Sequence, residues 1–287
     1  MVDITSIGDV TVDILVLDDI SFDTMENEQE VVNKILIKVG GGAANFSVWA
    51  SRLKLKVRLI SCLGNDIFSD FIEKELKKAG VDTKMARENV STSLTVAFSF
   101  KKERKYLISY KGSNSVFSIK HIPLQFLEGE ILYLAGYNLL DSLRKDFITL
   151  ASYAKEKNMI VCLDPDIKSR ISFNKEEFFK LVEKVDVLFL NEEECRKISN
   201  SLDWFKNRTL VIKRGSKGAF GIENGEKVEV EGIKIEKPCN TTGAGDVFNA
   251  SFLHHYYYGY DLRECLEFAN MQAVEYIKEI NSLNLKT

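Results

Sequence analysis

The sequence predicts an α/β fold, in which helices flank a doubly wound, mostly parallel β-sheet that carries a small inserted β-sheet. In the C-terminal half, short apolar runs alternate with amphipathic stretches, as in parallel sheets covered by helices on both faces. In the N-terminal half, two segments alternate apolar and polar residues, which is typical of strands in a smaller sheet. Glycine-rich turns precede two apolar helical stretches, and α/β proteins often bind ligands at such turns.

Composition limits the class of protein. Hydrophobic residues make up 45% and charged residues 28% of the 287 residues, which fits a single well-packed domain over residues 1–287. The formal net charge of −3 gives no basic surface for nucleic acid, and no apolar run reaches membrane-spanning length. The N-terminus lacks a signal-peptide pattern, and the five cysteines form no Cys-x-x-Cys motif. We therefore expect a cytoplasmic protein without a nucleic-acid or membrane partner.

The N-terminal third contains strand and helix signals in alternation. Their order is strand 3–17, strand 34–39, a helix ending at Arg52, strand 57–62 and helix 66–79. The first strand is interrupted at Gly8-Asp9, and Asp13 lies near its end. Asp13 is either an exposed strand residue or a ligand group, because open α/β sheets bind ligands at the carboxyl ends of strands.

Three adjacent glycines, Gly40, Gly41 and Gly42, lead into the first helix. Such a run is unfavourable in chain entropy, so we interpret it as a place where a ligand approaches the backbone, rather than as a plain turn. Asn45, in the first turn of the helix, can donate and accept hydrogen bonds with a hydroxyl-rich ligand.

Residues 93–110 predict a β-hairpin with a charged turn at Lys101–Arg104, followed by a return loop over Lys111–Asn114. Together with residues 34–39 this hairpin predicts a small sheet, which we place at about 15–39 and 91–113. The apolar face of such a sheet must be covered by a substrate, by the main domain or by a second subunit.

From residue 130 onward, strands and helices alternate regularly. The expected order is strand 131–135, helix 143–157, strand 159–163, helix 176–184, strand 187–190, a short helix from 192, strand 209–213, hairpin 219–230, and helices 246–258 and 261–280. The strand ends carry Asp164, Asn191, Glu194, Lys213 and Gly215. Oxygen ligands and a lysine at one sheet edge suit Mg²⁺ and phosphate. His254 and His255 have no third metal ligand nearby, so we expect a packing or surface role.

The stretch Thr242–Asp246 combines an anion site with a carboxylate. Gly243 and Gly245 leave backbone N–H groups open to an anion at the positive end of a helix. Asp246 lies in the first turn, where the same field is expected to keep it ionised. Phosphoryl transfer to an alcohol requires such an anion hole and base. The alternative is a tight turn with a helix-capping aspartate.

In their order and spacing, these motifs resemble those of the ribokinase-like (PfkB) carbohydrate kinases over about residues 3–280. The motifs are Gly8–Asp13, Gly40–Asn45, the inserted hairpin, Asn191–Glu194, Gly215–Gly218 and Thr242–Asp246. The resemblance implies an enzyme that uses ATP and Mg²⁺ to phosphorylate a primary hydroxyl of a small carbohydrate. The alternatives are a nucleoside kinase on the same scaffold and a non-catalytic sugar- or nucleotide-binding regulator, which would have no need of Asp246.

The resemblance also implies a role for each motif residue. Asp246 would be the catalytic base, with the anion hole formed by Gly243, Ala244 and Gly245. The implied substrate-binding residues are Asp13, Gly41, Gly42, Asn45 and Asn114. The implied nucleotide-binding residues are Asn191, Lys213, Gly215, Gly218 and Asn270. Glu194 would organise Mg²⁺ through water, and the inserted sheet would be a lid over the sugar and the contact of a homodimer.

Several positions depart from the family pattern. Asn240 replaces an acidic residue, and the family's Gly-Ala stretch is missing from Glu275–Thr287, so both changes argue against activation by K⁺. Gly136 stands where ribokinase has an acidic sugar contact, which argues against ribose and leaves hexoses, keto-sugar acids and nucleosides. Lys213 replaces a common hydroxyl residue. A nucleoside would need aromatic stacking near the lid, for which the candidates are Phe98, Phe100, Tyr106 and Tyr110.

Overall fold

The computed structural model describes residues 1–16, 31–100, 104–167, 174–199, 205, 208–235 and 241–285. Its main sheet contains the strands β1 (Ile4–Ile7), β4 (Val57–Leu63), β5 (Asp82–Arg87), β8 (Ile131–Ala135), β9 (Ile160–Asp164), β10 (Val187–Asn191), β11 (Thr209–Lys213), β12 (Ala219–Glu223) and β13 (Glu226–Val230). Their order across the sheet is β13-β12-β11-β10-β9-β8-β1-β4-β5. The strands from β11 to β5 in this order run parallel, whereas β12 and β13 form an antiparallel hairpin at one edge.

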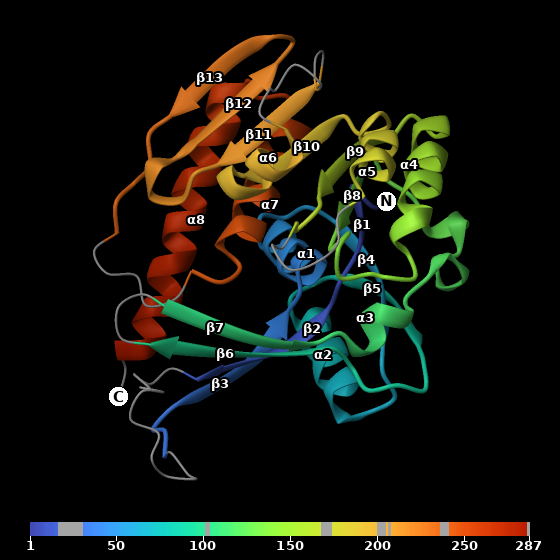
Figure 1. Cartoon of the computed structure of the whole chain (residues 1–287), viewed down its shortest axis with the longest axis vertical. Coiled ribbons are helices and arrows are strands. Elements are labelled where there is room, and N and C mark those ends of the chain that lie inside the picture. Colours follow the sequence, from blue (N-terminus) through green and yellow to red (C-terminus); the bar gives the residue numbers. More distant parts are fainter. Residues whose placement is uncertain are drawn as a thin grey trace.

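Helices cover both faces of the main sheet (Figure 1). They are α1 (Gly42–Arg52), α2 (Ile67–Lys78), α3 (Gly112–Val116), α4 (Phe147–Glu156), α5 (Lys175–Val182), α6 (Glu192–Ile198), α7 (Ala244–Tyr257) and α8 (Leu262–Leu285). Alternate residues of each central strand enter different cores. In β8, Tyr133 packs with the core under α1, α7 and α8, and Leu132 and Leu134 pack with the core under α4 and α5. A sheet covered on both faces is therefore confirmed.

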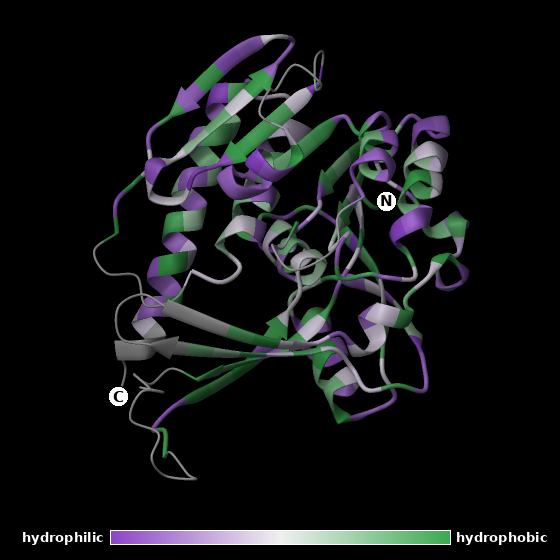
Figure 2. Ribbon diagram, in the orientation of Figure 1, coloured by the Kyte–Doolittle hydropathy of each residue, from purple (hydrophilic) through white to green (hydrophobic). Residues whose placement is uncertain are grey.

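A second, smaller sheet lies beside the main one and has the order β3-β2-β6-β7 (Figure 1). Its strands are β2 (Thr11–Val16), β3 (Ile35–Gly40), β6 (Leu94–Phe100) and β7 (Arg104–Tyr110). The cross-strand row Ile14, Ile37, Val96 and Ile108 makes one face apolar, and many of these strand residues are green in Figure 2. The next row, on the opposite face, contains Asp13, Lys38, Thr95 and Ser109.

The structure corrects several sequence predictions. Residues 3–17 form two strands in different sheets, so Asp13 lies in the middle of β2 and not at the end of β1. The chain crosses between the sheets at Gly8, where a Cβ atom would lie only 2.7 Å from the Ala135 carbonyl oxygen. The predicted loop Lys111–Asn114 is instead the start of α3, because Lys111 is the N-cap of this helix and Gly112–Asn114 lie within it. Strand β5 was not predicted, because this edge strand is partly exposed and lacks an apolar row.

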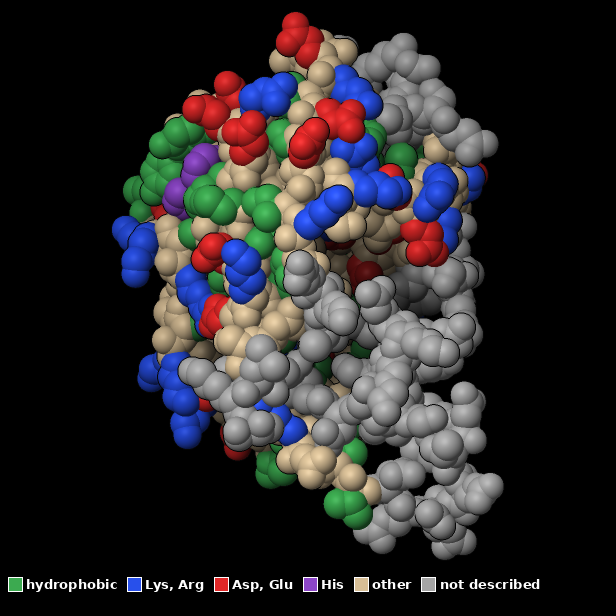
Figure 3. Space-filling model, turned by 90° about the vertical axis from the view of Figure 1, so that its left-hand side faces the viewer, with side chains coloured by type: hydrophobic (Ala, Val, Ile, Leu, Met, Phe, Trp, Pro, Cys, Tyr) green, Lys and Arg blue, Asp and Glu red, His purple; other side chains and the backbone are tan. Residues whose placement is uncertain are grey.

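The remaining predictions concern surface charge, the two adjacent histidines, membrane-spanning helices and a few positions that the structure does not describe. Figure 3 shows acidic and basic side chains interspersed on one side of the molecule, in keeping with the small net charge. The ring of His255 stacks on Phe268 with centroids 3.8 Å apart, which fits the expected packing role. Within the described ranges, the model contains no helix with the length and apolarity of a membrane span. Asn240, residues 17–30 of the expected small sheet and residues 101–103 of its turn lie outside the described residues.

Candidate active site

A cavity of about 700 Å³ lies between the carboxyl edge of the main sheet and one face of the small sheet. Every site residue predicted from the sequence lines this cavity. These residues are Asp13, Gly41, Gly42, Asn45, Asn114, Asn191, Glu194, Lys213, Gly215, Gly218, Gly243, Ala244, Gly245, Asp246 and Asn270. The structure therefore brings the separate motifs together in one cavity.

The turn before α7 presents backbone N–H groups to this cavity. Gly243 is the N-cap of α7 and adopts a left-handed conformation with φ of 89°, which favours glycine. A Cβ atom added to Gly245 would lie 3.5 Å from the Lys213 Nζ atom, so the ammonium group adjoins the turn. The Ala244 N–H donates to the Thr241 carbonyl oxygen over 3.2 Å. First-turn N–H groups have no partner within the helix, so those of Gly243 and Gly245, with the nearby cation, suit an anion.

Asp246 faces the binding residues of α1 across the cavity. Asn45 Nδ2 donates a hydrogen bond of 2.8 Å to Asp246 Oδ2. A Cβ atom on Gly42 would lie 3.6 Å from Asp246 Oδ1, so the backbone of α1 also approaches this carboxyl group. The N-termini of α1 and α7 thus converge on one carboxyl group, which lies beside the anion site.

The surroundings of Asp246 act on its proton affinity in both directions. Burial raises the pKa of Asp246 well above its ordinary value, and Asp164 raises it further. The hydrogen bond from Asn45 and the charge of Lys213 oppose this effect. The field of the helix N-terminus also favours the ionised form, as the sequence predicted, so burial and this field act in opposite directions. A raised pKa gives a carboxylate more affinity for a proton, as a general base needs near neutral pH.

A buried polar network holds Lys213 in place. Lys213 Nζ lies 2.7 Å from Asp164 Oδ2 and 3.2 Å from Asn249 Oδ1. Asn249 Nδ2 donates to Asp164 Oδ2 and, over 3.0 Å, to the Tyr133 hydroxyl. Burial alone would lower the pKa of Lys213, but Asp164 and Glu194 outweigh it, so the pKa is raised and the ammonium group stays charged. The sequence analysis missed Asn249, although its spacing of three residues from Asp246 places both on one side of α7.

Glu194 is fixed by the backbone around it. Its Oε2 accepts from the Asn191 N–H at 2.7 Å and its Oε1 from the Ile167 N–H at 2.9 Å, while Asn191 Oδ1 caps the Glu194 N–H at 2.8 Å. Burial and the neighbouring Asp164 raise the pKa of Glu194 to about 7. A nearby cation would stabilise the charged form of Glu194 and so lower this pKa.

The oxygen atoms around Glu194 suit a Mg²⁺ ion that keeps part of its water shell. No cluster of three His, Cys, Asp or Glu side chains that could hold a metal occurs in the described part of the chain. Mg²⁺ retains waters readily and is often bound by one or two carboxylates plus substrate phosphates. Because both oxygens of Glu194 already accept backbone hydrogen bonds, this carboxylate suits an ion that is bound through water. Its role in binding Mg²⁺ stays a prediction.

One end of the cavity is built around Asp13. Thr11 Oγ1 donates to Asp13 Oδ1 over 2.8 Å. Gly40 leaves room for the Asp13 carboxyl group, and a Cβ atom on Gly41, with φ of 94°, would lie 2.5 Å from the Asp9 carbonyl oxygen. Two of the three glycines are thus required by the protein's own packing, and the prediction that all three serve a ligand was too broad.

The opposite end of the cavity is less polar. Asn270 Nδ2 donates to the Glu231 carbonyl oxygen over 3.3 Å. Gly218, with φ of 89°, packs against the Val230 carbonyl oxygen, whereas a Cβ atom on Gly215 would meet nothing within 4 Å. Apolar residues complete this end, namely Ile233, Ile235, Ala273, Val274 and Ile277. A flat apolar group of a ligand, such as a nucleobase, fits this composition.

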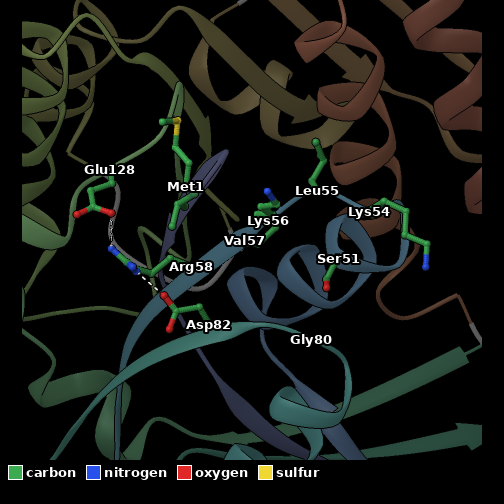
Figure 4. A pocket seen from close by; sticks show the side chains of 11 residues that line it. Met1, Ser51, Lys54, Leu55, Lys56, Val57, Arg58, Gly80, Asp82 and Glu128 are labelled. Carbon is green, nitrogen blue, oxygen red and sulfur yellow. Dashed lines mark hydrogen bonds and ion pairs between the residues drawn. The ribbon is translucent and has the colours of Figure 1, made fainter.

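A second hollow, of about 580 Å³, lies near the N-terminus (Figure 4). Its Arg58 is held by Asp82 at 2.7 Å and by Glu128 at 3.0 Å, as the dashed lines in Figure 4 show. None of the predicted site residues lines this hollow. Because its guanidinium is already paired with two carboxylates, we do not consider it an anion site.

The fold and the first cavity define a class of protein, namely α/β enzymes that transfer a phosphoryl group to a hydroxyl acceptor. The chain belongs to the pfkB family of carbohydrate kinases, whose family model matches residues 1–284. It is 27% identical over 232 residues to a nucleoside kinase of Methanocaldococcus jannaschii, which covers 79% of this chain and 74% of that protein. The crystal structure of the M. jannaschii nucleoside kinase superposes with a TM-score of 0.79 over 95% of this chain and 90% of that one.

A second relative has a different stated substrate. A 5-dehydro-2-deoxygluconokinase of Listeria innocua is 26% identical over 258 residues, covering 82% of this chain and 79% of that protein. A ribokinase structure from Thermotoga maritima, at 24% identity and a TM-score of 0.75 over 95% of this chain and 92% of that one, supports the fold alone. The chain is therefore a kinase with a hydroxyl acceptor, and kinases of this family use ATP, generally with Mg²⁺.

Proposed function

We propose that this kinase transfers the γ-phosphoryl group of ATP to a primary hydroxyl of a small carbohydrate, with Asp246 as the base. The observation that carries the proposal is the convergence of Asp246, the Gly243–Gly245 turn and the Lys213 ammonium group on one cavity. Asp13 and Asn45 lie on the acceptor side and offer hydrogen bonds that suit sugar hydroxyls. The donor nucleotide would lie along Gly215, Gly218 and Asn270.

Each residue then has a definite step in the reaction. Asn45 orients the Asp246 carboxylate, which accepts the proton of the attacking hydroxyl. The N–H groups of Gly243 and Gly245 and the ammonium of Lys213 stabilise the charge on the transferred group. Mg²⁺ held near Glu194 through water would neutralise charge on the phosphates. We propose that the small sheet is a lid, which closes over the acceptor and excludes water as a competing acceptor.

A ribonucleoside is the second candidate acceptor. Beyond Asp13, the cavity side of the small sheet continues with the apolar residues Leu15, Ala97 and Leu107. This arrangement offers hydroxyl-binding groups at one end and an apolar surface for a base at the other. Of the stacking residues suggested by the sequence, Tyr110 lines the cavity, whereas the strand register places Phe98 on the opposite face, in line with Val16. The likeness to a nucleoside kinase favours this candidate.

A panel of acceptors tests both candidates. Hexoses, keto-sugar acids and nucleosides would each be incubated with ATP and Mg²⁺, with and without K⁺, and ADP formation would be measured. We expect turnover with one acceptor class. We expect no requirement for K⁺, because this sequence lacks the family's acidic residue at position 240 and its C-terminal Gly-Ala stretch. Absence of turnover with every class would contradict the proposal and favour a binding protein.

We also propose that the outer face of the small sheet binds a second copy of the chain. Large apolar side chains remain exposed there, with exposed fractions of 53% for Ile35, 48% for Ile37 and 65% for Ile108. They lie on the face away from Asp13, so a partner there would leave the cavity accessible. A contiguous apolar patch of this kind is typical of an interaction surface.

A further inference from the structure

Three elements that are distant in the sequence meet behind the Gly243–Gly245 turn. Lys38 of β3 donates from Nζ to the Tyr276 hydroxyl of α8 over 3.2 Å. This hydroxyl donates in turn to the backbone carbonyl oxygen of Thr242 over 2.9 Å. The direction of both bonds is fixed, because an ammonium group only donates and a carbonyl oxygen only accepts. A hydrogen-bonded chain therefore connects the small sheet to the residue that precedes the N-cap of α7.

Packing around Tyr276 leaves its hydroxyl group little freedom. The ring meets Trp49 of α1 edge-on, with centroids 5.6 Å apart and an interplanar angle of 81°. Trp49 is itself held, since its Nε1 donates to Ser251 Oγ of α7 over 3.1 Å. A Cβ atom on Gly243 would lie 2.6 Å from the Tyr276 hydroxyl oxygen, so this oxygen forms one wall of the turn. The tyrosine thus sets where the turn can lie.

Lys38 also contributes charge near the acceptor. It pairs with Asp13 in the β2–β3 register. Burial lowers the pKa of Lys38, and the charges of Asp13 and Asp246 oppose this effect. The same burial raises the pKa of the Tyr276 hydroxyl, which therefore remains a hydrogen-bond donor. Lys38 thus interacts through charge with Asp13 and with the candidate base Asp246, and through Tyr276 it is hydrogen-bonded to the turn of the anion site.

We propose that Lys38 and Tyr276 are positioning residues for phosphoryl transfer. They fix the Thr242 carbonyl and, with it, the Gly243 N–H of the same peptide unit, which in this assignment faces the cavity. Lys38 belongs to β3 of the small sheet, and it reaches the anion site only through Tyr276 of α8. The anion site is therefore fully ordered only when the small sheet packs against α8. Neither residue contacts the transferred group in this assignment. The inference deepens the proposed function and rests on the anion-site role of Gly243–Gly245.

Steady-state kinetics of Lys38→Met, Tyr276→Phe and the double variant test the assignment. We expect each single change to lower kcat about 10–100-fold, with both KM values changed less than about threefold, because positioning affects the transition state more than binding. The double variant should be no more than about twofold slower than the slower single variant, since the two residues act as one chain. Effects that multiply, or that fall only on KM, would overturn the proposal. The matched controls are Lys78→Met on the surface of α2 and Tyr257→Phe at the end of α7.

Hydrogen exchange of the segment 241–247 gives a readout that needs no acceptor. We expect its amide protons to exchange faster in Lys38→Met and Tyr276→Phe than in the wild-type and control proteins. Unchanged exchange in both variants would overturn the positioning role, even in an active enzyme. Faster exchange in a protein that phosphorylates nothing in the panel would instead reject the proposed function and leave the positioning chain standing.

Discussion

At the scale of single residues, Asp246 has an environment that suits proton transfer. Its carboxyl group is buried, is hydrogen-bonded to Asn45, and lies among charges of both signs from several elements. The charged groups that influence it are Asp9, Lys38, Asp164 and Lys213. The pKa of Asp246 therefore depends on all of these groups together. Substitution of Asp246 tests the base itself, and substitution of a neighbouring charge tests how that charge changes the pKa of Asp246.

Replacement of Asp246 by Asn removes the base and keeps the shape. We expect kcat to fall at least about 10²–10⁴-fold, the range that general-base catalysis supplies. The dissociation constant for ATP should change little, because the backbone N–H groups of the turn remain. Kinetics and nucleotide titration measure the two effects, with Asp70→Asn on the surface of α2 as the control. Turnover close to that of the wild type would contradict the role of Asp246.

Lys213→Met should change how the rate depends on pH. Lys213 lowers the pKa of Asp246, so its loss leaves burial and Asp164 with less opposition, and that pKa rises. A base acts only when deprotonated, so activity is lost as pH falls through its pKa. The acid limb of kcat/KM should therefore move to higher pH, by about one unit for loss of a nearby opposite charge.

Lys213→Arg is the matched control for that change, because it keeps the positive charge. We expect its acid limb to stay near that of the wild type, even where kcat decreases. If the methionine variant loses turnover with an unmoved acid limb, Lys213 acts on the phosphates alone. Measurement of kcat/KM from pH 5 to 9 distinguishes these results.

At the scale of elements, the sequence predicted structure best where local chemistry is decisive. Helix α2 begins after Asp66, whose carboxyl group accepts from the N–H groups of Phe68 and Ser69. The hairpin of β12 and β13 turns at Asn224-Gly225, where both residues have positive φ. Strand β5 could not be predicted in this way, because its place at the sheet edge depends on pairing with β4.

The candidate site shows the same division. Glycine-rich turns and strand ends are local signals: the turns indicated Asp246 and Asn45, and the end of a predicted strand indicated Asn191. Tyr133 and Tyr276 gave no such signal, because they come from a buried strand and a long helix whose contacts are set only by tertiary packing. Residues that support a site from behind are therefore harder to predict than residues within its motifs.

The turn before α7 provides a test at this scale. Gly243→Ala places a Cβ atom 2.6 Å from the Tyr276 hydroxyl oxygen at a φ of 89°. We expect a loss of roughly 1–3 kcal/mol in the free energy of unfolding, from backbone strain and this contact. Gly259→Ala is the control, since its φ is 79° but no atom lies within 4 Å of the added carbon. Urea unfolding of both variants measures the difference, and equal losses would show that Tyr276 moves aside freely.

At the scale of the whole molecule, the two sheets form different sides of the cavity. The main sheet places the ends of β9, β10 and β11 along one side of the cavity, while the small sheet covers the acceptor end. The small sheet is polar around Asp13 on its inner face and apolar around Ile14 on its outer face. One element can thus close over a substrate and bind a partner, because successive strand residues point to opposite sides.

The proposed dimer can be tested at that outer face. Ile108→Glu places a charge in the cross-strand row with Ile14 and Val96, where a second copy would have to desolvate it. We therefore expect sedimentation to show a dimer for the wild type and a monomer for this variant at the same concentration. Ile67→Glu, at the start of α2 where Ile67 is 79% exposed, should leave the dimer intact. A wild-type protein that sediments as a monomer at all concentrations would rule out the second copy as the partner. If the variant dissociates but keeps its kcat, the inner face functions as a lid without the dimer, because closure over the cavity needs only the contacts of one chain.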